Sequence, residues 1–462
     1  MKWIIISCIL CIFGCFKEFR PSESFVTNYL TGPWKNFTDD QVNQEIFPVS
    51  TYSYFATLVI IFLITDFLRY KPIIILCGIS GAITFLLIIF GQDVLTMQIL
   101  EFFYGLFFST EVAYYTYIYA KVDKKHYQEV TSHTKAASLF GRCMAGIVAQ
   151  LTVSFDILDY HQLNYITLAV LIFATLWAFF LPSVPQSIYF HRKNDNHISL
   201  THKEEIILQQ NNVNQIFQRS EQSKEYSSSK INISLIYKVK KAYILLWKDF
   251  LGAYSNSHVI KWSIWWSFST CGYLQVISYI QLLWKTAVLP KDKIYNGAID
   301  FLYTIIGTIT VFCIGKMPLN WSLIGDVLVS FMSFVEGSLL VLSSFNYNIW
   351  LLYAAYIIFG NIYHIMVTIA SFEVAKCISE DSYGLIFGVN TFFALLLQSL
   401  LTAIVVNGNL KLDLRLQYFV YGGYFIVISI FYTIIGIINI IQHCKKGIGF
   451  KIWKNVSRGI ED

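Results

Sequence analysis

Charged side chains are scarce in this sequence. Only 14% of its 462 residues are Asp, Glu, Lys or Arg, while 55% are hydrophobic. Soluble globular domains usually carry about 25% charged residues, so much of this chain is not built to face water. The net charge of +5 at pH 7 is also too diffuse to indicate a nucleic acid as a partner. The composition therefore predicts an integral membrane protein whose main surrounding is the lipid bilayer.

The sequence also lacks the usual signs of catalysis. No nucleophile–base pair stands out, so an enzyme is not expected. No glycine-rich phosphate-binding loop is present, and ATP is therefore not the expected source of energy. The nine cysteines lie mostly inside apolar segments and show no disulfide framework, which favours a packing role for them. We expect no cofactor and no metal site.

Long apolar segments, by contrast, recur along the whole chain. Twelve of them approach the roughly 20 residues that a helix needs to cross a bilayer. The first is interrupted by polar residues, and we interpret it as one long, broken helix. The segments are 3–30, 47–67, 73–90, 96–119, 136–155, 163–181, 260–284, 294–314, 323–344, 349–370, 385–406 and 418–441.

Six segments, a polar interval and six more segments form the layout of a major facilitator protein. The predicted fold class is an all-α membrane protein with the major facilitator fold, in which twelve transmembrane helices form two six-helix halves. The halves cover residues 1–184 and 258–442, and a cytoplasmic tail covers residues 443–462. The linker, 185–257, is polar, and its first two-thirds are predicted to be disordered. From 235 to 251, apolar residues recur at helical spacing between lysines, which predicts an amphipathic helix on the inner leaflet.

The placement of basic residues predicts the orientation. An even number of crossings puts both termini on one side, and lysine and arginine concentrate in the loops of that side. They include Arg69, Lys71, Lys121, Lys124, Lys125, Lys135, Lys445 and Lys446. The positive-inside rule then predicts cytoplasmic termini. The sequon at Asn36 falls on the opposite side, where it can be glycosylated.

A few ionisable residues lie inside the apolar segments, where they are costly and usually mark a substrate or ion path. Glu101, Tyr104 and Glu111 recur at spacings of three and seven in the fourth segment, so they share one broad helix face. Glu23 adds an acid in the broken first segment. Arg142 lies in the fifth segment, where it either neutralises Glu111 or Glu101 or meets the substrate.

Two other groups of charges have different interpretations. Asp300, Glu336 and Glu373 of the second half complete the set of intramembrane charges. Asp66 and Arg69 follow the second segment in the pattern of the charged cytoplasmic clasp of major facilitator proteins. For these two residues, gating is a better interpretation than substrate contact.

Several short runs resemble a known family. They are RPSESF (20–25), LTGP (30–33), KNFT (35–38), EIFP (45–48), TYSY (51–54), TDFLRYKP (65–72), EVAYY (111–115), YIY (117–119), IYNGA (294–298) and FGVNTF (387–392). Together they resemble solute carrier family 19, which comprises reduced folate carriers and thiamine transporters. The resemblance runs from about residue 8 to about 440, apart from the linker. It implies the major facilitator fold, plasma-membrane residence and uptake of a water-soluble B vitamin.

Charge separates the two branches of that family. Folates carry two carboxylates and need cations, whereas thiamine is an aromatic cation and needs carboxylates and aromatic faces. The folate branch has cations where this chain has Glu111, Gly360 and Gln398. The thiamine branch has the same residues at the first and third of these positions. The resemblance therefore favours thiamine.

By the same resemblance, the binding site includes Glu23, Phe47, Glu101 and Tyr104. Three departures from the thiamine branch leave alternatives open: Ser50 replaces a stacking Trp, Arg142 replaces a Tyr, and the stretch 273–278 has no Asn where that branch has one. Reduced folate and a pyridoxine-like vitamin are the other substrates to consider, and a receptor that lost transport is the other class. Proton exchange is compatible with the intramembrane acids but is not indicated by them alone.

Overall fold

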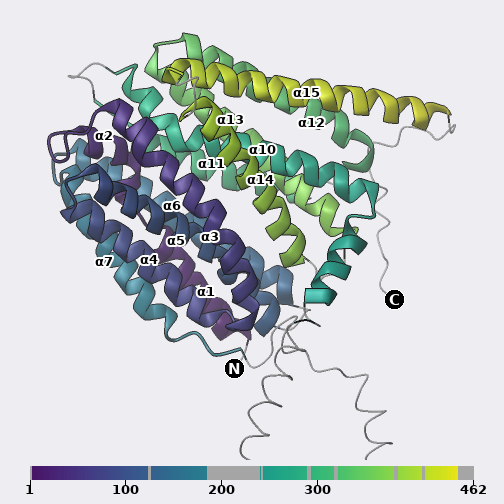
Figure 1. Ribbon diagram of the computed structural model, residues 1–462, viewed down its shortest axis with the longest axis horizontal. Helices are drawn as coiled ribbons and strands as arrows, with labels where there is room; N and C mark the ends of the chain where they lie inside the picture. Colours follow the sequence, from purple (N-terminus) through teal and green to yellow (C-terminus); the bar gives the residue numbers. More distant parts are fainter. Residues whose placement is uncertain are drawn as a thin grey trace, which may run out of the picture.

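The computed structural model describes residues 3–122, 126–184, 240, 243–288, 293–316, 321–378, 383–407 and 412–445 (Figure 1). Regular structure within these residues is helical. The first part of the predicted linker, 185–239, and the end of the predicted tail, beyond residue 445, lie outside the described residues. The domain boundaries placed there remain predictions.

The first membrane crossing is broken in its middle. α1 (Trp3–Glu18) ends ahead of a 3-10 turn, η1 (Pro21–Phe25), and α2 (Val26–Thr31) completes the crossing. Pro21 has no N–H to donate to a continuing helix, and it disfavours the helical conformation in the residue before it. Arg20 accordingly has φ −126° and ψ 73°. The interruption predicted from the polar residues is therefore fixed in place by a proline.

Eleven further long helices complete the two halves. In the first half they are α3 (Phe47–Phe67), which follows the π-helical turn η2 (Gln41–Ile46), α4 (Lys71–Phe90), α5 (Val94–Lys121), α6 (Tyr127–Ser154) and α7 (Tyr160–Ala178). In the second half they are α10 (Ser257–Lys285), α11 (Asn296–Lys316), α12 (Trp321–Phe345), α13 (Ile349–Ala375), α14 (Tyr383–Val405) and α15 (Leu414–Lys445). The predicted fold of twelve helices in two groups of six is confirmed. α6 begins earlier than predicted because its first turns are polar, and hydropathy does not detect them.

Nine helices within the described residues are long and apolar enough to cross a membrane by length and composition alone. α1, α5 and α10 are not among them. α1 is 16 residues long and depends on α2 to complete its crossing. α5 carries Glu101 and Glu111, and α10 buries polar side chains such as Ser267 and Gln275. α5 and α10 carry these polar groups on faces turned to the protein interior, so their lower hydropathy does not indicate a shorter path across the membrane.

The outer surfaces of both halves are apolar. Ile60 of α3, Phe90 of α4, Phe331 of α12 and Ile430 of α15 are each more than half exposed. Exposed apolar side chains on so many helices would be unusual for a soluble monomer, whereas in a bilayer they form the lipid-facing surface.

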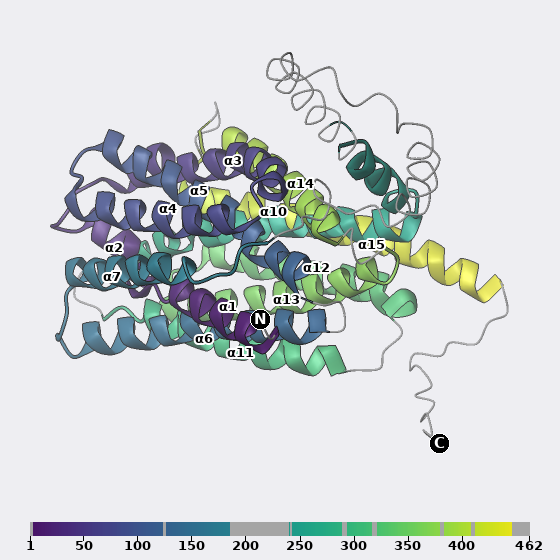
Figure 2. The ribbon, with the colours of Figure 1, turned by 90° about the horizontal axis from the view of Figure 1, so that it is seen from below.

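Two pairs of helices join the halves: α3 lies beside α14, and α6 lies beside α11 (Figure 2). The second pair is very close. A Cβ added to Gly146 of α6 would lie 2.7 Å from the carbonyl oxygen of Gly297 in α11, and one added to Gly297 would lie 2.9 Å from the carbonyl oxygen of Gly146. Facing glycines permit this crossing, as small residues do in other membrane helix pairs.

Hydrogen bonds between the halves concentrate at the end of the bundle that carries α2, here called the α2 end. Gln281 of α10 donates to the carbonyl oxygen of Glu23 at 2.7 Å, and Ser24 donates to Asp300 of α11 at 2.6 Å. Further bonds at this end join Lys285 to Asp39, Asn407 to Tyr52 and Gln44, and Gln150 to Ile294 and Ala298.

Residues 243–253 form a helix just before α10, which overlaps the predicted amphipathic helix. Ile244, Trp247 and Leu251 are exposed on it, while Phe250 stacks between Trp247 and Tyr254. Exposed apolar residues at spacings of three and four form one face, as expected for a helix that lies on a membrane surface.

Replacing Gly146 by Ala should destabilise the protein, because the added Cβ meets the backbone of α11. Overpacking of this kind costs about 1–3 kcal/mol. The matched control is Gly423→Ala in α15, where an added Cβ meets nothing within 4 Å and where Ala gains up to about 1 kcal/mol of helix propensity. Thermal unfolding in detergent should show a lower Tm for Gly146→Ala only. Equal Tm values for the two variants would contradict the close crossing.

Candidate functional site

The break in the first crossing brings four charged side chains into the middle of the bundle. Lys17 and Glu18 end α1, Arg20 occupies the break, and Glu23 lies in η1. Charges at this depth persist only when partners or water compensate them. The neighbouring helices supply those partners.

Glu18 is the centre of this cluster. Its carboxylate contacts Lys17 at 2.9 Å, Arg20 at 3.2 Å and Arg142 at 2.7 Å. Only 6% of its side chain is exposed. One buried carboxylate thus neutralises part of three cations, and short contacts of this kind are strong where water is scarce.

The expectation that Arg142 neutralises an acid of α5, either Glu111 or Glu101, is wrong, since its ion pair is with Glu18. The reason is the path of α6, which packs against α1. At Gly141 the two backbones are so close that an added Cβ would lie 2.1 Å from a carbonyl oxygen of α1. The next side chain in α6 therefore reaches the end of α1 and not α5.

Glu111 instead pairs with Lys17 at 2.5 Å. The Lys17 ammonium is buried, and it also lies 5.7 Å from the ring centroid of Phe107 and 5.8 Å from that of Tyr114. Aromatic faces attract cations at this distance. Glu111 is thus committed to holding a buried lysine, although part of its side chain faces solvent.

Glu23 and Tyr104 lie in contact with each other. The Tyr104 hydroxyl donates to Glu23 Oε1 at 2.9 Å, and the Arg20 guanidinium lies 3.0 Å from the same oxygen. Nearly a third of the Glu23 side chain is exposed. The carboxylate is therefore held in place from one side and open on the other.

Glu101 differs from the other acids of the first half. Its side chain is buried, and no ion pair is found for it among the described residues. Its polar neighbour is Ser50 of α3. A Cβ added to Gly105 of α5 would lie 1.9 Å from the Ser53 hydroxyl of α3, so the two helices are close there. This acid keeps an uncompensated charge or a proton.

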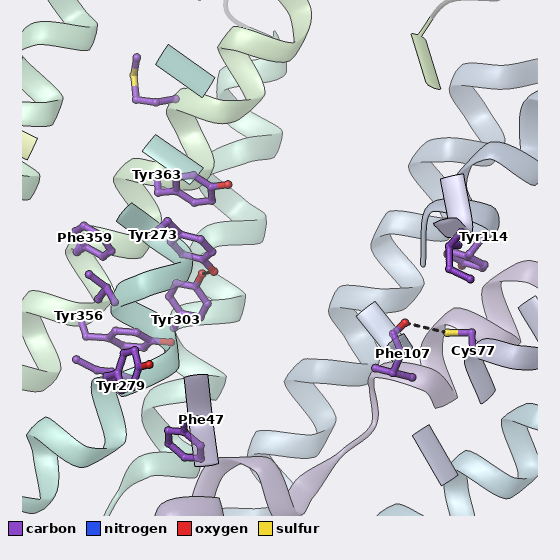
Figure 3. Packing of buried hydrophobic residues seen from close by; sticks show 14 of the residues in the cluster. Phe47, Cys77, Phe107, Tyr114, Tyr273, Tyr279, Tyr303, Tyr356, Phe359 and Tyr363 are labelled. Atoms are coloured by element: carbon purple, nitrogen blue, oxygen red, sulfur yellow. Dashed lines mark hydrogen bonds between the residues drawn. The ribbon is translucent and has the colours of Figure 1, made fainter. Parts of the chain in front are cut away.

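Both halves also contribute buried aromatic rings (Figure 3). In the second half, Tyr273 stacks on Tyr363 with centroids 3.8 Å apart, and its hydroxyl lies 2.7 Å from that of Tyr303. Phe47 packs against Tyr279 at 6.2 Å, so it closes one side of the space between the halves. Sequence reasoning found Phe47 but missed these tyrosines, because they are distant in sequence.

Arg142 shows that water enters this space. Its side chain is 41% exposed, although it lies midway along α6 between the halves. Tyr273, Tyr303 and Asp300 of the second half lie within its electrostatic reach. Hydrogen bonds join the halves at the α2 end, opposite the end that carries the N-terminus of α1. The conformation is closed at the α2 end.

The predicted gate lies at that other end. Arg69 is exposed, and it and Tyr70 both have positive φ, 62° and 67°. Non-glycine residues adopt such φ values only under constraint, so this loop between α3 and α4 is a strained turn. The side chain of Asp66 lies outside the described side chains, so its pairing with Arg69 remains a prediction.

Asn36 lies at the α2 end, in an exposed turn with φ 57°. The neighbouring Lys35 is buried and donates to the carbonyl oxygen of Ile89 at 3.1 Å, and it also donates to that of Gly91. This contact ties the turn to the end of α4, where carbonyl groups are free to accept. The sequon is thus presented away from the termini.

Sequence reasoning missed the roles of Lys17 and Glu18. Their signal was available, because two adjacent charges inside an apolar helix need partners within the membrane. For metals, the search of the described residues gives no group of three or more His, Cys, Asp or Glu that could hold an ion.

Sequence comparison places the chain among vitamin carriers. Thiamine transporter 2 of Homo sapiens is 39% identical over 440 residues, which cover 93% of this chain and 89% of that protein. Thiamine transporter 1 of Mus musculus is 39% identical over 462 residues, covering 96% and 92%. Folate transporter 1 of Caenorhabditis elegans is 36% identical over 433 residues, covering 93% and 92%.

Solved structures agree on the fold. A POT family transporter in complex with a thioalcohol-conjugated peptide matches with a TM-score of 0.60 and 10% identity, covering 95% of this chain and 96% of that chain. The nucleoside transporter NupG matches with a TM-score of 0.57 and 15% identity, covering 94% and 98%. The model of the reduced folate carrier family matches residues 1–420. The chain belongs to the reduced folate carrier family.

Proposed function

We propose that this chain imports thiamine by alternating access, driven by a gradient and not by ATP. The observation that carries the proposal is the charge balance of the site. Lys17, Arg20 and Arg142 face the three carboxylates of Glu18, Glu23 and Glu111 in direct ion pairs. The cluster is therefore neutral before any further acid is counted.

Two more acids border the same space without an ion pair among the described residues. They are Glu101 and Asp300, and the second accepts a hydrogen bond from Ser24. A neutral cluster with added acids suits a cation, and it repels a folate with two carboxylates. Arg142 does not repel thiamine in this arrangement, because Glu18 already compensates it.

The roles follow from this balance. Glu101 and Glu23 hold the amine-bearing side of thiamine, and Tyr104 with Phe47 provides aromatic faces for its rings. Since Phe47 packs on Tyr279 here, its ring becomes available when the halves shift. Arg69 with Asp66 acts at the gate opposite the α2 end. Release of a proton from Glu101 as the cation binds would couple the two ions.

The orientation is part of the same proposal. The termini lie in the cytoplasm, the α2 end faces outward and the chain resides in the plasma membrane. The conformation described is then closed to the outside. Relatives named as transporters support a carrier over an enzyme.

Reduced folate is the second candidate, favoured by the exposed guanidinium of Arg142. A folate carboxylate displacing Glu18 from Arg142 would reuse that cation. After this exchange, Lys17 and Arg20 would be the remaining cations in contact with Glu18. The folate anion would also lie close to Glu101 and Asp300, which have no ion pair among the described residues. The charge balance therefore favours thiamine.

Glu101→Gln should lower uptake of labelled thiamine at least tenfold. A hydrogen bond to a charged group is worth roughly 1.5–3 kcal/mol, and about 1.4 kcal/mol corresponds to a factor of ten. The matched control is Glu45→Gln, the same change at an exposed acid of η2. Cell-surface labelling verifies equal expression. Unchanged uptake by Glu101→Gln would remove Glu101 from the site.

Arg142→Tyr should retain thiamine uptake, because Glu18 keeps two of its three cations. Cells expressing the wild-type chain or the variant are given labelled thiamine and a labelled reduced folate. The proposal would be overturned if the wild-type chain took up folate but not thiamine, and if Arg142→Tyr abolished the folate uptake without producing thiamine uptake. Saturable binding without accumulation in vesicles would indicate a receptor.

Asn36→Gln should remove a glycan if the α2 end is extracellular. The expected result is a faster-migrating band on gel electrophoresis, equal to that of wild-type protein treated with a glycosidase. Asn232→Gln is the control, since that sequon lies in the predicted cytoplasmic linker. A mobility shift for Asn232→Gln and none for Asn36→Gln would reverse the orientation.

A further inference from the structure

Glu336 is a buried acid that the proposed site does not use. It lies in the middle of α12, and its side chain has no exposed surface. Neither carboxylate oxygen has a hydrogen-bond partner. Asp326, on the same helix, shows the contrast, because it pairs with Lys261 at 2.6 Å and also accepts from Asn439.

Among the described residues, no ion pair with Glu336 is found. Gly337, the residue after Glu336 in α12, packs closely against Gly422 and Ile426 of α15. One turn before Glu336 in α12, the Ser333 hydroxyl accepts a hydrogen bond from the Trp265 indole of α10 at 3.4 Å.

The titratable groups of the adjoining helices are phenols. Tyr363 of α13 lies within electrostatic reach of Glu336. On α15, Tyr421 accepts from Gln275 at 2.9 Å, and Tyr424 donates to the carbonyl oxygen of Phe268 at 2.8 Å. No cation faces the carboxyl group among the described residues.

Such surroundings tolerate only the neutral acid. An ionised carboxylate without a partner or water is far more costly to bury than a protonated one, and the group takes up a proton instead. Packing of α12 against α15 is extensive and would gain from an apolar residue. A costly acid at this position is therefore unexplained by packing.

Polar groups lead from Glu336 toward the space between the halves. The Tyr363 hydroxyl lies 3.0 Å from Thr270 Oγ1, and the Tyr363 ring stacks on Tyr273 (Figure 3). The Tyr273 hydroxyl contacts that of Tyr303, which bonds His364. This series ends near Arg142. A series of polar groups thus runs from the surroundings of Glu336 to the partly exposed Arg142.

We propose that Glu336 is a proton-binding site of the transport cycle, protonated in the conformation described here and deprotonated when the second half rearranges and water reaches it. In that step the carboxyl O–H bond breaks, the proton passes to water, and the carboxylate remains. The reverse step restores the acid. The proposal rests on the proposed function as a gradient-driven carrier, and it adds a proton site distant from the substrate.

Glu336→Gln tests this proposal, because Gln resembles the neutral acid and cannot release a proton. The full-length protein is purified and placed in vesicles. Two rates of labelled thiamine movement are measured: exchange with thiamine on both sides, and uptake under an imposed pH gradient. We expect near wild-type exchange and loss of the stimulation by the gradient. Glu45→Gln should retain both.

Other results would overturn the proposal. A gradient response equal to that of the wild type, or loss of exchange and uptake together in folded protein, would make Glu336 a purely structural residue. If Glu336→Gln does not fold, Glu336→Asp replaces it, and the infrared C=O band of a protonated carboxyl group is compared with the wild type. Absence of a band that depends on residue 336 would also overturn the proposal.

The infrared band separates the two proposals. A wild-type chain that moves no thiamine would overturn the proposed function. The band would still report on the protonation of Glu336, since it needs no substrate.

Discussion

The contact of Glu18 with three cations is the interaction on which the rest of the site depends. Pro21 ends α1 within the membrane and leaves Glu18 at the end of the helix, where Lys17, Arg20 and Arg142 reach it. Removal of this one carboxylate would leave three cations to share the two acids that remain in the cluster, and a buried cation without its partner is strongly destabilising. The broken crossing is thus both a structural requirement and the origin of the proposed binding site.

Neutrality within the cluster changes how the other acids are interpreted. Glu111 suggested a cationic substrate from sequence, yet it is bound to Lys17. Arg142 suggested the opposite, yet it is bound to Glu18. The charges of the two residues that gave the most direct indication of the substrate are therefore each compensated by another residue of the protein. Glu101 keeps its significance because no such partner compensates it among the described residues.

Sequence predicted the spans and the break in the first helix, because these follow from hydropathy and from the polar residues that interrupt the first apolar segment. It did not predict which cation meets which acid. That choice depends on helix packing, here on Gly141, which lets α6 approach α1. The tyrosines of the second half were missed for a similar reason, since Tyr273, Tyr303 and Tyr363 become neighbours only after three helices assemble.

The turn that carries Glu23 also carries contacts between the halves. Gln281 donates to the carbonyl oxygen of Glu23, and Ser24 donates to Asp300. Opening the α2 end must break these bonds, so the backbone of η1 is released when the halves separate there. A short turn between two helix ends is easier to move than a continuous helix, because few of its bonds lie within it. The proposed substrate contact at Glu23 and the closure of the α2 end therefore depend on the same five residues of the chain, Pro21–Phe25.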